Sequence, residues 1–432
     1  MDLSDLSRDL PKPSSSISDF PPELLTKIFK SIPYWPSDNR RKTLASLCLV
    51  NHYFLLLARP LLYNSLKIHI DWDDPRCLRF MLGTLFGQRH CSRHVKSLRV
   101  TFEKEGQNEI GALKMILHAV KLDTLKIKAS QPIQFFQTIL WSQPNLKKLV
   151  LPDYLMDERL ISQCFPLLPE LEIFKGRIWV DENREFEEEE AEHQEEVNDD
   201  RPAPFSTPPT FKLRELYLAW GPRQDAFDYT VQFSFNTLTH LTLTMNDWRA
   251  VLDLSKLVAL ESLVFVANSN NVSLFGGEAP CLLALRECMK TVKTLPSLRS
   301  LAFEGTLQWT KKSPFAAEIL SSLPESLEEL SLGKFNSSSF NFELFRRQLS
   351  SLPLLRKVSL LRTKKHPSDS LLEDLLTRYR VQVIINPKSD KRVNHYLGDE
   401  IDPTGASSEV DSEGEDGADN GSDSRGEEVF NL

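Results

Sequence analysis

Apolar residues recur along most of this chain in one short pattern: an apolar residue, two variable positions, usually a leucine, and another apolar residue two positions later. Eleven copies have as central residues Leu66, Leu98, Leu125, Leu149, Leu171, Leu216, Leu241, Leu263, Leu301, Leu330 and Val358. Because a strand turns alternate side chains to opposite faces, the last two apolar positions of each copy share one face. The pattern therefore predicts eleven strands, and residues 381–385 predict a last one.

Helical spacing of apolar residues separates several of these strands. It is present at residues 78–85, 110–117, 160–165, 281–294 and 371–376. Alternating strands and helices, at intervals mostly of 22 to 32 residues, resemble a leucine-rich repeat. The resemblance implies an α/β fold, a curved solenoid over residues 65–388 with a parallel sheet on its concave side. An α/β domain of another kind is the alternative.

The outward residues of the strands are the expected reading surface of such a solenoid. They include Arg99, Thr101, Lys126, Lys128, Val150, Tyr217, Thr242, Thr244, Val264, Glu329 and Ser331.

A different pattern precedes the repeats. Pro21, Pro22 and Glu23 form a typical helix start. The N–H groups of a first helical turn have no acceptor within the helix, so proline loses no hydrogen bond there, and the positive end of the helix favours a carboxylate. A stripe of apolar residues at helical spacing runs from Leu24 to Ile32. A polar loop is expected at residues 37–43, a second helix around residues 44–48 and a third after Asn51. Three short helices cannot bury all of these apolar groups among themselves, so part of the surface is expected to face a partner.

Residues 20–29, 44–54 and 58–63 together resemble an F-box of the fungal type, which gives a three-helix F-box over residues 17–64. The resemblance implies docking on the Skp adaptor of an SCF-type cullin-RING ubiquitin ligase, with the rest of the chain selecting a protein substrate. The residues that it places against Skp are Pro21, Pro22, Leu24, Leu25, Ile28, Phe29, Leu47 and Val50. The chain departs from the family in a longer, basic connection at residues 34–43 and in Phe20, where a leucine is usual. A helical cap on the repeat array that binds nothing is the alternative.

Charge is distributed very unevenly along the chain. The whole chain carries −8, whereas residues 181–200 and residues 399–432 each carry −11, so the remaining residues carry +14. An acidic, proline-rich insertion loop is expected at residues 181–209, a disordered leader at residues 1–16 and a disordered acidic tail at residues 389–432.

Composition and motifs narrow the function further. No apolar run approaches the ~20 residues of a membrane span, and the amino terminus lacks a secretory pattern, so a cytoplasmic or nuclear location is expected. Six scattered cysteines indicate reduced thiols rather than disulfides. The closest approach to a metal cluster, His90, Cys91 and His94, fits no standard zinc spacing, so no metal, no cofactor and no enzymatic activity are expected.

Three functions follow as hypotheses. The first is a non-catalytic substrate adaptor, which binds Skp, and through it a cullin, with the helices and an unknown protein substrate with the repeats. The second is a repeat scaffold for protein–protein interaction without a ligase role. The third, a solenoid that binds nucleic acid, is the least favoured, because the basic residues are spread out and two acidic segments would compete with phosphate.

Overall fold

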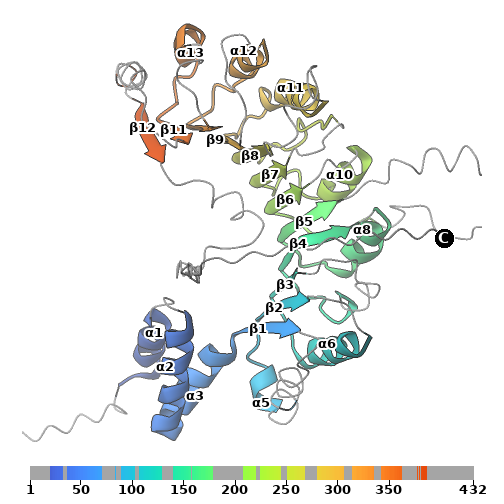
Figure 1. Ribbon diagram of the computed structural model, residues 1–432, viewed down its shortest axis with the longest axis vertical. Coiled ribbons are helices and arrows are strands. Elements are labelled where there is room, and N and C mark those ends of the chain that lie inside the picture. The colour runs from blue at the N-terminus through green and yellow to red at the C-terminus, as the bar shows by residue number, and fades with distance from the viewer. Residues whose placement is uncertain are drawn as a thin grey trace, which may run out of the picture.

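The structure is a computed structural model that describes residues 20–32, 37–70, 83, 89–102, 107–128, 140–156, 158–178, 208–219, 224–244, 251–267, 280–305, 314–334, 342–361, 377, 379 and 381–386. Within these ranges, three helices precede a single sheet of twelve parallel strands (Figure 1). The expected leader and tail, and residues 181–207 of the expected insertion, lie outside the described residues.

The amino-terminal helices form a small unit of their own. They are α1 (Pro22–Ser31), α2 (Ser37–Val50) and α3 (His52–Tyr63). Pro22 and Glu23 occupy the first turn of α1, as predicted. The Asn51 side chain caps α3, because its Oδ1 accepts from the Phe54 N–H at 2.8 Å.

Helix α2 corrects one prediction, because residues 37–43 are helical rather than a polar loop. Ser37, Asp38 and Asn39 are residue types that favour helix starts, and no Gly or Pro interrupts the chain from there to Val50. The basic run also has a packing role, since Arg40 is buried. Polarity alone therefore misidentified a first helical turn as a loop.

The sheet has the simplest possible topology, because its strands lie side by side in chain order from β1 to β12. Their bounds are β1 Ser65–Ile70, β2 Ser97–Phe102, β3 Thr124–Lys128, β4 Lys148–Met156, β5 Ile173–Ile178, β6 Glu215–Ala219, β7 His240–Thr244, β8 Ser262–Ala267, β9 Ser300–Gly305, β10 Glu329–Lys334, β11 Lys357–Leu361 and β12 Gln382–Asn386. Eleven strands and a last one were predicted and the sheet has twelve, of which the fifth lies three residues beyond its predicted position.

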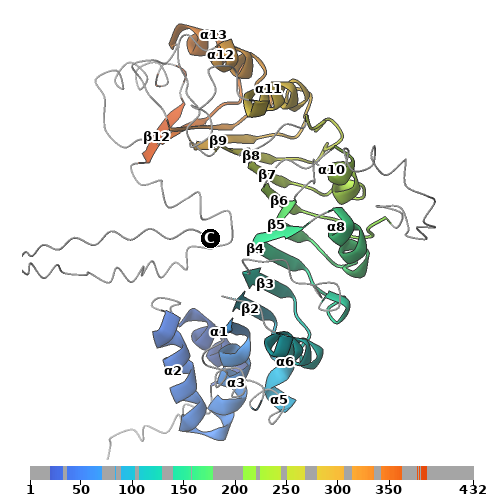
Figure 2. The same ribbon diagram turned by 45° about the vertical axis from the view of Figure 1, so that its right-hand side comes forward.

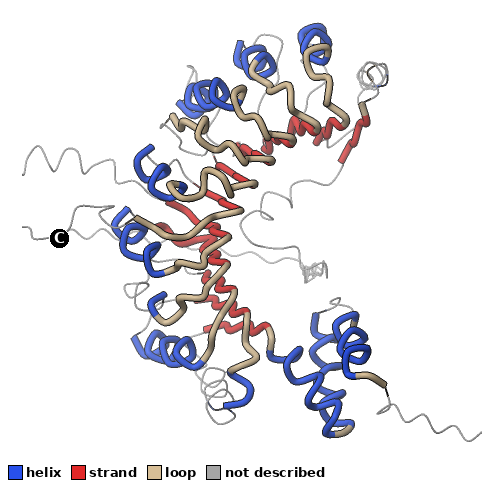
Figure 3. Tube along the Cα trace, turned by 180° about the vertical axis from the view of Figure 1, so that it is seen from behind, coloured by secondary structure: helices blue, strands red, loops and turns tan. Residues whose placement is uncertain are grey.

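Helices follow many of the strands and cover the outer side of the arc, while the strands line its inner side (Figures 1, 2 and 3). They are α5 Arg89–Ser92, α6 Gln107–Ala119, α8 Glu158–Cys164, the 3-10 turn η2 Phe165–Leu167, α10 Gln224–Val231, α11 Pro280–Val292, α12 Pro314–Ser321 and α13 Phe342–Leu349. Three predicted helices are confirmed as α6, α8 and α11. The helices predicted at residues 78–85 and 371–376 fall almost wholly outside the described residues. The fold is a curved, leucine-rich-repeat-like solenoid.

The core runs through the solenoid as one continuous cluster from Ile68 to Val381. The strand register stacks one residue from each repeat, Leu66 on Leu98, Leu98 on Leu125 and so on to Val383. A single repeat cannot bury its apolar face, so stability comes from this stacking.

The fifth repeat departs from the predicted register by three residues. The prediction placed Leu171 in line with Leu149, but Phe174 pairs with Leu149 and Gly176 with Leu151. Leu171 and Ile173 match the leucine pattern by coincidence, because they precede the true core pair. The Phe174 ring packs at 5.0 Å between ring centroids on Phe165. A large ring beside a glycine thus replaces the usual two aliphatic side chains.

A regular ladder connects the repeats at the edge where the strands begin. We call edge ladder the residues two positions before each core residue, namely Asn64, Lys96, Asp123, Lys147, Glu172, Arg214, Thr239, Glu261, Arg299, Glu328 and Arg356. From Asn64 to Glu328, each of these carbonyls accepts from two consecutive N–H groups of the next repeat, at 2.7–3.2 Å. Because each repeat supplies the acceptor for the next, these backbone N–H groups are satisfied by backbone carbonyls alone.

Candidate protein-binding surfaces

Helix α1 has two apolar faces, and only one of them is covered. Leu25 and Phe29 are 4% exposed and lie in the core of the helical unit. The Phe29 and Phe54 rings meet edge to face at 5.4 Å. Leu24 directly precedes Leu25, and Ile28 directly precedes Phe29. The side chains of Leu24 and Ile28, four residues apart, are 47% and 51% exposed. This spacing places them on one outward stripe of the helix.

Further exposed apolar residues lie at the junction of α2 and α3. Leu49 is 87% exposed and Val50 is 60% exposed. The Tyr53 hydroxyl donates to the Phe20 carbonyl oxygen at 3.2 Å, so the junction lies beside the start of α1. Phe20 is itself exposed. We call these five exposed residues, Phe20, Leu24, Ile28, Leu49 and Val50, the helical apolar surface.

The eight residues predicted to face Skp divide into three groups. Pro21, Pro22, Leu24, Ile28 and Val50 are exposed, Leu47 is half-buried against the core of the unit, and Leu25 and Phe29 are inside it. A partner docked on this unit would not reach Leu25 or Phe29 without opening the core. The prediction omitted Phe20 and Leu49, and Phe20 precedes the Pro21 N-cap of α1, so helical spacing does not place it. The binding role of the exposed residues stays a prediction.

The helical unit joins the solenoid without a linker. Asn64 alone separates α3 from β1, and its carbonyl oxygen accepts from the N–H groups of Lys96 at 2.9 Å and Ser97 at 3.0 Å. Helix α3 also contacts α5 and β1. Despite this contact, the core around Leu25, Phe29 and Phe54 is a cluster separate from the core of the solenoid. The helical unit is therefore attached to the solenoid by hydrogen bonds, but it has a hydrophobic core of its own.

The concave face of the solenoid is the second candidate surface. Lys128 is exposed, and Arg99, Thr101 and Thr242 are partly exposed, as a reading surface requires. Five predicted reading residues are instead buried, namely Lys126, Val150, Tyr217, Thr244 and Val264. The register places Val150, Tyr217 and Val264 in one row with Lys175 and Thr242, where neighbouring strands shield each other. The middle of the concave face is thus largely closed by its own side chains.

Tyr217 is shielded from solvent in the middle of the concave face. Burial raises the pKa of Tyr217 to about 12, against smaller opposing effects of a hydrogen bond with Thr244 and of the Arg177 charge. Thr244 Oγ1 in turn donates to the Leu218 carbonyl oxygen at 3.0 Å. The phenol stays protonated at neutral pH, so it offers no charge to a ligand.

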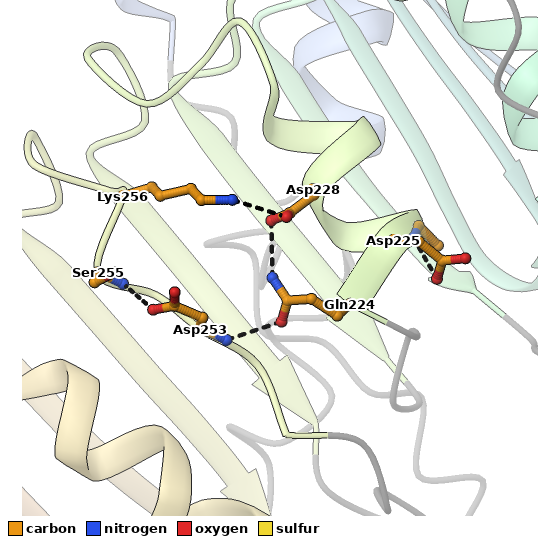
Figure 4. A network of polar contacts seen from close by, with 7 residues as sticks. Gln224, Asp225, Asp228, Asp253, Ser255 and Lys256 are labelled. Atoms are coloured by element: carbon orange, nitrogen blue, oxygen red, sulfur yellow. Dashed lines mark hydrogen bonds and ion pairs between the residues drawn. The ribbon is translucent and has the colours of Figure 1, made fainter.

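A polar network on the outer side of the solenoid has a structural role. Gln224 donates to Asp228 at 2.8 Å and accepts from the Asp253 N–H at 2.8 Å, while Lys256 donates to Asp228 at 2.9 Å (Figure 4). The Asp228 carboxylate raises the pKa of Lys256 through this hydrogen bond. The network ties α10 to the loop of the next repeat.

The described ranges offer no cluster of metal ligands and no membrane-spanning helix. Among the described residues, no three His, Cys, Asp or Glu side chains gather closely enough to hold a metal ion. Cys48, Cys91, Cys164 and Cys288 form no disulfide, and burial raises the pKa of Cys288 to about 11. Along the described parts of the chain, no helix combines the length and the hydropathy that crossing a bilayer requires.

Comparison with known proteins gives distant similarities. No protein-family model and no curated protein match this chain. Among solved structures, it is similar to the leucine-rich repeat-containing protein LegL7 of Legionella pneumophila, with 14% identity and a TM-score of 0.37 over 78% of this chain and 98% of that one. A protein of Bacteroides fragilis gives 11% identity and a TM-score of 0.28 over 75% of this chain and 65% of that one. The repeat architecture itself follows from the strand order and register.

Proposed function

We propose that this chain is the substrate-recognition adaptor of an SCF-type cullin-RING ubiquitin ligase. In this proposal, the helical unit is an F-box that binds the Skp adaptor, and the solenoid holds a protein substrate. The observation that carries the proposal is the helical apolar surface, five exposed apolar residues on a three-helix unit that already has its own core. Exposed apolar patches of this kind mark protein interaction sites.

The arrangement of the two parts supports the same function. An adaptor performs no chemistry but raises the local concentration of substrate near the ubiquitin-loaded enzyme. That effect is largest when the connection fixes the geometry, and here one residue separates α3 from β1. The hydrogen bonds from Lys96 and Ser97 to Asn64 hold this connection.

A repeat scaffold without a ligase role is the second candidate. The contacts of α3 with α5 and β1 favour it, because terminal repeats of a solenoid need a cap. A pure cap would merge its apolar face with the core that it covers. The two cores are separate clusters, and the apolar stripe of α1 faces away from the interior. The adaptor therefore accounts for more of the surface.

The test is co-purification with a Skp protein, comparing the unchanged chain with the double variant Leu24→Asp, Ile28→Asp. Both side chains are exposed, so the variant is expected to fold. We expect Skp binding to weaken by at least about thirtyfold, as when a central contact is lost from an interface.

The matched control is Leu283→Asp, Leu354→Asp, which changes two similarly exposed leucines of the solenoid. It is expected to bind Skp as the unchanged chain does. If the unchanged chain fails to bind, or if both variants bind equally well, the adaptor is rejected and the scaffold becomes the leading function.

A further inference from the structure

The outward positions of the first five strands carry a concentration of basic side chains. Seven of the paired positions that face the concave side are basic, and we call them the basic face: Lys67, Arg99, Lys126, Lys128, Lys148, Lys175 and Arg177. None of the outward positions in these pairings holds an Asp or a Glu. The register places Lys67, Arg99 and Lys126 next to one another across adjacent strands. The paired neighbours of Lys128, Lys148, Lys175 and Arg177 are neutral.

The other seven strands differ clearly. Their paired outward positions carry Glu215, Glu304 and Glu329 against Lys334 and Lys357, and most of the rest are neutral. Among the paired outward strand positions, the positive charge is therefore gathered on β1–β5, and β1 adjoins the helical unit. This gathering was not visible in the sequence, where the seven residues are spread over more than a hundred positions.

Six of the seven side chains of the basic face can reach a ligand in the concavity, whereas Lys126 is buried. Lys67 and Lys128 are exposed, while Arg99, Lys148, Lys175 and Arg177 are partly exposed. Carboxylates are compatible with this surface, since Lys175 forms an ion pair with Glu215 at 2.5 Å. Strands spaced by ~4.8 Å make five strands about 19 Å wide, the length of roughly six residues of extended peptide.

We propose that the basic face binds an acidic polypeptide segment, which is the class of substrate that this solenoid selects. Lysine and arginine side chains donate charge-assisted hydrogen bonds to carboxylates, and several in one row give a preference for closely spaced acidic residues. A nucleic acid fits less well, because single strands are held largely by stacking on aromatic side chains. The paired outward positions of β1–β5 hold no Phe, Tyr or Trp, and Tyr217 on β6 is buried.

This inference rests on the proposed function only in taking the concave face as the substrate side. Its test uses the full chain and a fluorescent deca-glutamate peptide, with deca-glutamine as the neutral control peptide. We expect saturable binding of deca-glutamate that weakens as salt rises from 50 to 500 mM, because screening shortens the range of the charges, with a Debye length of about 10 Å at 0.1 M.

Two variants with the same charge change locate the site. Lys67→Glu, Lys128→Glu reverses two exposed residues of the basic face, whereas Lys121→Glu, Lys293→Glu reverses two exposed lysines in turns outside the strands. We expect at least about tenfold weaker binding for the first variant and a change under about twofold for the second. Circular dichroism of both variants checks that they fold.

Several results would overturn the inference. They are no binding of deca-glutamate, equal loss in both variants, or tighter binding of an oligothymidylate than of deca-glutamate. Binding that is seen only after residues 399–432 are removed would also overturn it, since the acidic tail of this chain would then be the occupant. Skp co-purification is independent of these measurements, so failure of one proposal is distinguishable from failure of the other.

Discussion

Phe174 and Gly176 fill one space in the core together. A Cβ built on Gly176 would lie 2.6 Å from Cζ of Phe174, so the ring occupies the space that a side chain at position 176 fills in other repeats. The ring is held by edge-to-face contact with Phe165, which also contacts Phe211 at 5.2 Å. Because this core is close-packed, neither the ring nor its neighbours can move aside cheaply.

We therefore predict that Gly176→Leu destabilises the protein by about 1–3 kcal/mol through overpacking. Phe174→Leu should cost about 1–3 kcal/mol by leaving a void. The double variant restores the usual leucine pair, so its cost should fall below the sum of the single costs by at least about 1 kcal/mol. Urea unfolding of the four proteins measures this coupling, and strictly additive costs would contradict it.

Gln143 is a buried polar residue, and the leucine pattern of the repeats does not predict its burial. Its Oε1 accepts from the Leu122 N–H at 2.9 Å, and its Nε2 donates to the carbonyl oxygens of Leu117 at 2.6 Å and Val120 at 3.1 Å. It thereby satisfies three backbone groups where the chain leaves α6 for β3. Water does not replace it easily, because the side chain is buried.

Gln143→Ala is predicted to lower the free energy of unfolding by about 2–4 kcal/mol, since buried backbone groups would lose their partners. Gln163→Ala, at an exposed position of α8, should change it by less than about 0.5 kcal/mol. Thermal and urea unfolding of both variants give the comparison. Similar small effects at the two positions would show that the Gln143 hydrogen bonds are dispensable.

The edge ladder links neighbouring repeats by charge as well as by backbone hydrogen bonds. From Lys96 to Arg356 its charges alternate in sign, with the neutral Thr239 as the one interruption. Glu328 lies between two cations, with Arg299 at 3.8 Å and Arg356 at 3.9 Å. Each exposed pair contributes little, about 0.2–1 kcal/mol, but an alternating row also avoids placing like charges side by side.

Glu328→Lys would place three cations in a row and is predicted to destabilise the protein by about 1–2 kcal/mol at low salt. Most of this loss should disappear at 1 M salt, where the Debye length falls to about 3 Å. Glu325→Lys, an exposed control three residues earlier, should have little effect at either salt concentration. A loss that is the same at both concentrations would show that it is steric rather than electrostatic.

Regular elements were predictable from the sequence wherever stacking enforces a pattern. Every strand was found, because a strand buried on one face needs apolar residues at period two. The fifth register failed because Phe174 and Gly176 share one space, which single-residue propensities do not describe. On α1, the sequence shows two adjacent apolar stripes, Leu24 with Ile28 and Leu25 with Phe29. Which of them is exposed depends on where α3 packs, so only the structure separates the candidate site from the core.

The molecule as a whole consists of two packed bodies joined by a short rigid connection. The helical unit holds Phe29, Leu44 and Phe54 in its own core, while the solenoid core continues through all repeats. Neighbouring repeats of a solenoid unfold cooperatively because they share interfaces. The helical unit meets the solenoid through contacts of α3 with α5 and β1 and through a hydrogen bond from Arg41 of α2 to the Ser65 carbonyl oxygen at 3.2 Å. Its stability is therefore expected to be largely its own.

Phe54→Ala tests this independence in the full chain. It removes the ring that meets Phe29, and we predict a loss of about 3–5 kcal/mol confined to the helical unit. Hydrogen–deuterium exchange should show faster exchange in α1 and α2, with protection of β3–β11 unchanged. Phe303→Ala removes a ring stacked on Phe265 at 5.7 Å. It should speed exchange in the strands and leave the protection of α1 and α2 unchanged. If Phe54→Ala also exposes the strands, the two bodies unfold as one and the helices act as a cap. If it does not, the helical unit is free to serve as a separate docking module.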